Sequence, residues 1–250
     1  AFLAFFHSGK PVFFPDITYS FYDVCAELYR IPYEQKKLDE DFRIVKEDYM
    51  AENGGIIIPN PNAPTGILER TEMIEEIVAG NQGSIVIIDE AYVDFGGESC
   101  RKLIDKYENL LVVQTFSKSR AMAGLRIGFA MGGEKLIRYL KDVMFSFNSY
   151  TMNMLSVELG PEPVRDEVYF RGTVRKIIAT RERVKKELAD MGFTFPDSKG
   201  NFIFASHRDI PAKRIFEELK QQGVYVRYWE KPRIDNYLRI TIGTDEEMDI

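Results

Sequence analysis

The sequence is poor in the residues that metal centres and disulfide frameworks require. Its 250 residues include two cysteines, Cys25 and Cys100, and two histidines, His7 and His207. None of these is spaced as a metal-ligating pair, and the cysteines indicate free, unreactive thiols of the kind typical in a reducing compartment. We therefore expect no metal site and a cytoplasmic location, and we assign both histidines to surface or packing roles.

The sequence also lacks an excess of positive charge and long apolar runs. Lysine and arginine number 33 against 39 aspartates and glutamates, which gives a formal net charge of −6. A nucleic-acid-binding face needs a basic excess, and a membrane-spanning helix needs about 20 consecutive apolar residues, so we expect neither nucleic acid nor membrane as a partner. The apolar opening, residues 1–6, lacks a basic stretch and a cleavage site, so we interpret it as the end of a core helix in a fold that begins further upstream.

The sequence does contain a regular alternation of strand and helix signals over about its first 145 residues. Short apolar runs typical of strands fall at 10–15, 55–59, 84–88, 110–114 and 126–131, another strand starts at 30–32, and helical spacing falls at 20–29, 69–79 and 133–143. The run 85–88 is apolar at every position, as expected of a strand covered on both faces. We therefore predict an α/β fold with a mostly parallel sheet covered by helices.

The pattern changes after residue 160. A break is predicted at 160–163 and a long connecting helix at 164–191. Strands are predicted at 201–204, 224–228 and 237–242, and a helix at 212–222. We predict two domains, a large one at 1–160 and a smaller C-terminal α+β domain at 161–250. We expect the first to lack its N-terminal part and the second to be incomplete at its end.

The segment Thr115–Gly128 places one lysine among small and hydroxylated residues. Lys118 follows a strand-like run, and open α/β sheets bind ligands at the carboxyl ends of their strands. An amine buried there loses proton affinity and becomes a nucleophile, while Ser117, Ser119 and Arg126 offer donors for a phosphate ester. The segment therefore predicts a site for a phosphate-bearing carbonyl cofactor. The alternative is a solvated loop lysine, with Arg126 in a surface ion pair.

Two other strand-like runs end in groups that suit such a cofactor. Asp89 follows the run 84–88, where a partly desolvated carboxylate is costly without a cationic partner such as a protonated ring nitrogen; capping of the next element is the alternative. Tyr92, three residues on, is placed to reach the same ligand with its hydroxyl. The alternative is a half-buried packing residue whose hydroxyl is hydrogen-bonded elsewhere. Asn62 lies in a proline-bounded turn that aims its amide, although turn chemistry alone also explains it.

These segments resemble those of pyridoxal-phosphate enzymes of the fold-type-I aminotransferase family, and most closely the histidinol-phosphate aminotransferases of class II. Four motifs carry the resemblance, in the family's order and spacing: NPNAPTG at 60–66, IDEAY at 88–92, TFSKSRAMAGLRIG at 115–128 and LRITIGT at 238–244. The resemblance implies a large cofactor-binding domain followed by a small C-terminal domain. It also implies a homodimer whose active site is shared between the subunits.

The resemblance assigns roles to individual residues. Lys118 forms the Schiff base with pyridoxal 5′-phosphate and then acts as the catalytic base, and Asp89 pairs with the pyridinium nitrogen so that the ring accepts electrons. The resemblance also implies that Tyr92 and Asn62 contact the phenolic oxygen of the cofactor. It implies that Ser117 and Arg126 bind the phosphate and that Tyr19 stacks on the ring face. Ala63 stands where the family often has asparagine, which leaves Asn62 as the nearest amide.

Two arginines of the small domain predict an anionic substrate. Arg239 lies within an alternating strand, where its planar group suits a carboxylate or phosphate, and Arg227 resembles the second anion-binding arginine of the histidinol-phosphate enzymes. The alternative for each is an edge-strand cation that discourages aggregation.

The function implied by the resemblance is a transamination in histidine biosynthesis. Histidinol phosphate and imidazole acetol phosphate form one substrate pair, and glutamate and 2-oxoglutarate form the other. The alternatives are an aromatic amino-acid aminotransferase or a phospho-amino-acid decarboxylase on the same scaffold, and a non-catalytic sensor domain that binds the cofactor. The lack of a basic DNA-binding segment counts against the sensor.

Overall fold

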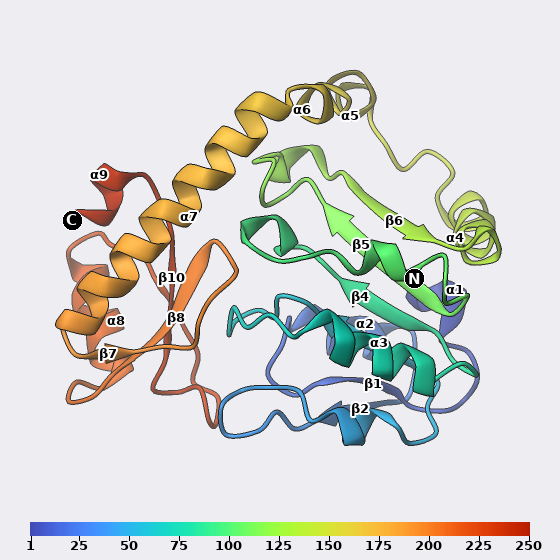
Figure 1. Ribbon diagram of the computed structural model, residues 1–250, viewed down its shortest axis with the longest axis horizontal. Coiled ribbons are helices and arrows are strands. Elements are labelled where there is room, and N and C mark those ends of the chain that lie inside the picture. The colour runs from blue at the N-terminus through green and yellow to red at the C-terminus, as the bar shows by residue number, and fades with distance from the viewer.

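The computed structural model describes residues 1–250 and contains two β-sheets connected through one long helix (Figure 1). The first sheet has six strands in the order β2-β1-β3-β4-β5-β6. Neighbouring strands from β2 to β5 run parallel, and β6 pairs antiparallel with β5. The strands are β1 Val12–Pro15, β2 Tyr33–Lys36, β3 Gly55–Pro59, β4 Val86–Asp89, β5 Leu110–Thr115 and β6 Gly128–Gly132. The prediction of a mostly parallel, helix-covered sheet is confirmed.

The central strands of this sheet are apolar because both of their faces are covered. Side chains alternate between the two faces of a strand, so neighbours in β3 enter different cores. Ile56 packs with residues of α3 (Thr71–Gly80), whereas Ile57 packs on the opposite face with residues of α2 (Phe21–Leu28) and α4 (Glu134–Phe147). Burial on two faces leaves the strand ends as the place where polar groups can reach solvent or a ligand.

The remaining helices are short, with one exception. Helix α7 (Glu167–Asp190) has 24 residues and runs from α5 and α6 to the second sheet (Figure 1). The others are α1 Phe2–Phe5, α5 Met154–Leu159, α6 Glu162–Arg165, α8 Ala212–Gln221 and α9 Asp245–Met248, with 3₁₀ turns at Lys46–Tyr49, Val93–Phe95, Cys100–Leu103 and Ala123–Leu125. None of the helices combines the length and apolar composition that a bilayer span requires.

The second sheet is antiparallel and has the strand order β7-β8-β10-β9. Its strands are β7 Phe193–Thr194, β8 Phe202–His207, β9 Arg227–Tyr228 and β10 Leu238–Thr241. Val184 and Leu188 of α7 share a core with Ile203 and Ala205 of β8. The C-terminal part of the chain therefore has an apolar cluster of its own, and the division into domains at residue 160 stays a prediction.

The two sheets are linked by a third apolar cluster and by one buried cation. Phe204 of β8 packs edge-to-face on Phe42, at 5.7 Å between ring centroids, and both belong to a cluster with residues from the loops of the first sheet. Arg181 of α7 is almost fully buried, and its Nη1 donates to the carbonyl oxygens of Phe95 and Gly200, each at 2.8 Å. These contacts fix the second sheet beside the loops of the first.

Several predicted boundaries shift for identifiable reasons. The predicted strand at 224–228 is reduced to Arg227–Tyr228, because Gly223 at φ +81° closes α8 and the Val224 amide donates back to the Leu219 carbonyl. The long helix begins at Glu167 instead of 164, because the Asp166 side chain accepts from the Tyr169 amide and caps its start. The sequence did not predict β7, which is two residues long.

Candidate active site

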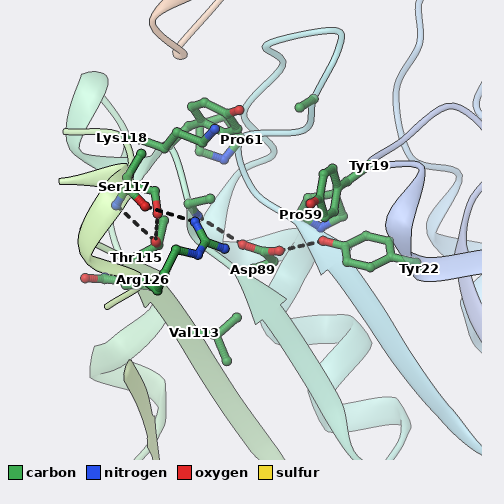
Figure 2. Close-up of a pocket in the computed structure, with 15 residues that line it drawn as sticks. Tyr19, Tyr22, Pro59, Pro61, Asp89, Val113, Thr115, Ser117, Lys118 and Arg126 are labelled. Carbon is green, nitrogen blue, oxygen red and sulfur yellow. Dashed lines mark hydrogen bonds between the residues drawn. The ribbon is translucent and has the colours of Figure 1, made fainter. Parts of the chain in front are cut away.

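A pocket of about 380 Å³ opens at the carboxyl edge of the first sheet (Figure 2). Pro59, Asp89 and Thr115 line it, and they are the last residues of β3, β4 and β5. Parallel strands end on the same edge of a sheet, and the strand order reverses between β1 and β3, which is where open α/β sheets form ligand crevices. The fold therefore brings together motifs that lie far apart in the sequence.

Asp89 lies on the wall of this pocket with both carboxylate oxygens already engaged. The Tyr22 hydroxyl donates to Oδ2 at 2.6 Å, and the Ala91 amide donates to Oδ1 at 3.1 Å (Figure 2). Burial raises the pKa of the Asp89 carboxyl, while these two donors and the charge of Lys118 oppose that shift. The site thus holds a desolvated carboxylate, which suits a cationic partner.

The sequence patterns do not identify Tyr22 as a site residue, although it lines the pocket. It lies on the first turn of α2, three residues after Tyr19, and the two rings meet edge-to-face with centroids 5.6 Å apart. The i, i+3 spacing of two tyrosines at a helix start was a signal that both face one side. Tyr19 keeps 54% of its surface exposed and lines the same pocket, so the structure leaves part of its ring accessible.

Lys118 lines the pocket in the loop after β5, but the expectation of a buried amine is wrong. Phe116 and Ser119 take the buried positions of this loop, so Lys118 between them is exposed. Its Nζ lies 5.3 Å from the centroid of the Tyr92 ring. Tyr92 also lines the pocket and packs edge-to-face on Phe202 of β8.

Hydroxyl and guanidinium groups gather on one side of the pocket. The Thr115 hydroxyl donates to Ser117 Oγ at 2.9 Å, and Arg126 lies nearby in the left-handed backbone region at φ +56° (Figure 2). Arg126 Nη1 donates to the Ala123 carbonyl oxygen at 3.0 Å, and no carboxylate pairs with its guanidinium. Ser119 does not belong to this group, since it is buried and its hydroxyl donates to Asp94.

Asn62 is not brought into the pocket lining. Its Nδ2 donates to the Ile17 carbonyl oxygen at 2.9 Å and to Thr65 Oγ1 at 3.2 Å, and its Oδ1 accepts from the Thr18 hydroxyl. The amide thus braces the turn, while its neighbour Ala63 lines the pocket. A contact between Asn62 and a cofactor stays a prediction that this arrangement does not support.

Arg239 and Arg227 lie outside the pocket lining, on paired strands of the second sheet. They are opposite each other in the register of β10 and β9. Their guanidinium carbons lie 5.7 Å and 5.5 Å from the centroid of the Trp229 ring, and Arg239 is also 5.3 Å from the Phe202 ring. Trp229 and Phe202 therefore connect the arginine pair to Tyr92, and so to the pocket.

The arginine pair lacks an anionic partner within the chain. Arg239 Nε is buried and has no hydrogen-bond partner. Burial and the neighbouring charge of Arg227 lower the pKa of the Arg239 guanidinium. The electrostatic interaction with Tyr92 opposes this shift. Two cations on opposed positions of paired strands, with no carboxylate partner, offer donors that suit a carboxylate or a phosphate.

Comparison with known proteins places this geometry in a family. All of residues 1–250 match the family model for aminotransferase class I and II. The chain is 52% identical over 250 residues to the histidinol-phosphate aminotransferase of Brachyspira hyodysenteriae, which covers 100% of this chain and 71% of that relative.

Two solved structures share the fold. The histidinol-phosphate aminotransferase of Clostridium acetobutylicum has a TM-score of 0.89 at 22% identity, over 96% of this chain and 75% of the other. That of Sinorhizobium meliloti, solved in complex with pyridoxal-5′-phosphate, has a TM-score of 0.87 at 21% identity, over 97% of this chain and 68% of the other. On the family model and the sequence identity together, the chain belongs to the aminotransferase class I and II family.

Proposed function

We propose that the chain interconverts histidinol phosphate and imidazole acetol phosphate, with glutamate and 2-oxoglutarate as the second pair, as a step of histidine biosynthesis. The observation that carries this proposal is the convergence of Lys118, Asp89 and Tyr19 on one pocket at the strand ends. The chain is also half identical, along its whole length, to a relative named for this activity.

We infer that the cofactor is pyridoxal 5′-phosphate, because the donor set of the pocket fits it. Asp89 offers a desolvated carboxylate to a ring nitrogen, Ser117 and Arg126 offer donors to a phosphate, and Tyr19 offers an accessible ring face. The volume of about 380 Å³ lies in the usual range for small-molecule sites, about 300–1,000 Å³. When bound, this cofactor supplies a carbonyl that links to amines and a ring that withdraws electrons.

Lys118 is the proposed catalytic base. Its amine is exposed at the pocket and held by no ion pair, so Nζ is free to turn within reach of a bound substrate. The Tyr92 ring, 5.3 Å from Nζ, limits the directions that the amine can take. Lys118 Nζ would take the proton from the substrate carbon and return it on the same face of the site. Tyr92 and Asp89 complete the proposed catalytic set.

Arg239 and Arg227 are the proposed substrate-binding residues. The unpartnered Nε of Arg239 and the adjacent guanidinium of Arg227 suit the carboxylate of glutamate and the phosphate of histidinol phosphate, which would bind in turn. The aromatic rings of Phe202 and Trp229 lie against Arg239 and restrict its movement.

We also propose that the enzyme is a cytoplasmic homodimer. Large apolar side chains remain exposed along 145–159, and contiguous exposed apolar surface is typical of protein interfaces. They are Phe145, Phe147, Tyr150, Met152, Met154, Leu155, Val157 and Leu159. A second copy of the chain is the expected partner, and the molar mass in solution tests it.

The cofactor assignment is tested by an absorbance scan of the chain with added pyridoxal phosphate. We expect a new absorbance band that depends on Lys118 and that changes when glutamate is added. The variant Lys118→Ala should lose the new band and all turnover, whereas Lys135→Ala, on α4 outside the pocket, should keep both. A band unchanged in Lys118→Ala would overturn the assignment.

The substrate assignment is tested by following the products. Transamination of histidinol phosphate with 2-oxoglutarate produces glutamate and releases no carbon dioxide. Carbon dioxide released from phospho-amino acids would favour the decarboxylase instead, and faster turnover of aromatic amino acids would favour an aromatic aminotransferase. Cofactor binding without any turnover would favour a sensor domain.

A further inference from the structure

We propose that Tyr22 is a positioning residue that orients the Asp89 carboxylate, through its hydroxyl, toward the ring nitrogen of the cofactor. This inference rests on the proposed function, because it assumes that Asp89 meets a ring nitrogen. It concerns a residue to which neither the sequence pattern nor the resemblance assigns a role.

The geometry of the pair is specific. Tyr22 comes from α2 and Asp89 from the end of β4, 67 positions later, yet the two side chains are joined at 2.6 Å (Figure 2). Tyr22 is buried, with 7% of its surface exposed, so little of it is available to solvent. An ionised carboxylate accepts at about four positions, and two protein donors leave acceptor sites that face the pocket. The hydrogen bond from Tyr22 therefore fixes the rotation of the carboxylate while keeping it able to accept.

The surroundings also decide which of the two groups carries the proton and donates the hydrogen bond. Burial and the Asp89 charge raise the pKa of the Tyr22 hydroxyl well above its ordinary value, so Tyr22 keeps its proton and acts as the donor. Burial raises the pKa of Asp89, and the bond from Tyr22 is the largest opposing influence. Without that hydroxyl, Asp89 would take up a proton at a higher pH and lose its charge.

Other charged and titratable groups near Asp89 act less directly. Lys118 lowers the Asp89 pKa through its charge alone, with no hydrogen bond to the carboxylate. The titratable groups that line the same pocket are Tyr19 before α2, Tyr92 after β4, and Lys118 and Arg126 after β5. Only Tyr22 donates a side-chain hydrogen bond to Asp89.

The substitution Tyr22→Phe isolates the hydroxyl, because the ring keeps its packing. Tyr22 packs on Phe14 with ring centroids 5.8 Å apart and on Tyr19 at 5.6 Å, and a phenylalanine preserves both contacts. Tyr33→Phe is the matched control. Tyr33 stacks on the same Phe14 at 5.3 Å, but its hydroxyl donates to Glu27 and not to Asp89.

The test measures the affinity for pyridoxal phosphate by equilibrium dialysis across pH. We expect Tyr22→Phe to bind on the order of tenfold more weakly, as for the loss of a hydrogen bond to a charged group. We also expect its affinity to fall at a higher pH than in the wild type as the solution is acidified. Tyr33→Phe should match the wild type in both respects. Thermal unfolding of each variant checks that the fold is kept.

A double-mutant cycle with Asp89→Asn tests whether Tyr22 acts through Asp89. In the Asp89→Asn background, Tyr22→Phe should change the affinity by about twofold or less. Equal losses in both backgrounds, or an unshifted pH profile, would overturn the inference while leaving the function intact. A wild-type chain that fails to bind pyridoxal phosphate would instead overturn the proposed function.

Discussion

At the residue scale, the pocket and the second sheet each contain a group that is unfavourable for the folded chain by itself. Asp89 is a carboxylate in a desolvated position, and Arg239 has a buried Nε without a partner. Such groups destabilise a fold unless a ligand pairs with them. Ligand binding therefore explains these two groups better than the stability of the fold does.

The substitution Asp89→Asn should stabilise the chain in the absence of pyridoxal phosphate. Burial raises the folded-state pKa of Asp89, so in the window just above its ordinary value the folded chain binds the proton more tightly than the unfolded chain. The free energy of unfolding therefore decreases as the pH rises through that window. Asparagine has no charge to desolvate, so the variant should be more stable at pH 8, with a smaller difference at pH 5.

Urea unfolding at the two pH values measures this effect. Asp105→Asn is the control, because that carboxylate is exposed and outside the pocket. A variant that is less stable than the wild type at pH 8 would contradict the assignment of Asp89 as a costly, ligand-directed charge.

Residue identities could be predicted from the sequence where a motif fixes both the residue and its surroundings. Lys118, Asp89, Tyr92, Ser117, Arg126 and Tyr19 all line the pocket. Tyr22 could not be found this way, because its partner lies 67 positions away and only the packing of α2 on the sheet joins them. The exposure of Lys118 also escaped prediction, since the path of a loop after a strand depends on which neighbours fill the core.

At the element scale, the turn at 60–66 joins the first sheet to the second. The Gly66 amide donates to the Asn62 carbonyl oxygen at 2.8 Å, and the Lys199 amide donates to the Gly66 carbonyl oxygen at 2.7 Å. Gly66 has φ +75°, and a Cβ on it would lie 2.3 Å from Ser198 Oγ. This glycine is needed for its backbone conformation and for the close approach of the two loops.

The substitution Gly66→Ala should lower the free energy of unfolding by about 2 kcal/mol or more, from the left-handed conformation and the clash with Ser198. It should also weaken pyridoxal phosphate binding, because Ala63 of the same turn lines the pocket. Urea unfolding and dialysis measure the two effects. Gly83→Ala is the control, since a Cβ there meets open space. Equal stability of the two variants would show that the turn tolerates a side chain.

Strands and helices were easier to predict than their junctions. The run 55–59 coincides with β3, because an apolar segment bounded by glycine and proline admits few alternatives. Strand β9 was predicted too long, because its first residues are used by the turn that ends α8. Hydrogen bonds between neighbouring elements, which periodicity does not report, decide these boundaries.

At the scale of the whole molecule, Arg181 is a buried link between the two sheets. It is among the largest fully buried side chains, and its two bonds from Nη1 join a carbonyl after β4 to one before β8. Its Nε also pairs with Glu182 at 2.9 Å. A buried cation that satisfies carbonyl oxygens from both parts keeps their relative position well defined.

The substitution Arg181→Met should cost about 3 kcal/mol of stability, because it leaves two buried carbonyl oxygens without donors. We also expect a broader or two-step urea transition, since the two parts would lose a shared contact. Arg171→Met, an exposed position on the same helix, is the control and should change stability by about 0.5 kcal/mol or less. A single sharp transition of unchanged midpoint in Arg181→Met would contradict the role of Arg181 as a link.

The position of Trp229 between Arg227 and Arg239 gives the molecule a built-in optical reporter. Trp229 is the single tryptophan of the chain, so all indole emission comes from the place where the substrate anion is proposed to bind. Phosphate-bearing substrate should change its fluorescence in a saturable way, and Arg227→Gln should raise the concentration needed. If the emission stays constant while turnover proceeds, the substrate anion binds somewhere other than at Arg227 and Arg239. Substrate arrival can thus be timed separately from the chemistry at Lys118, without any added label.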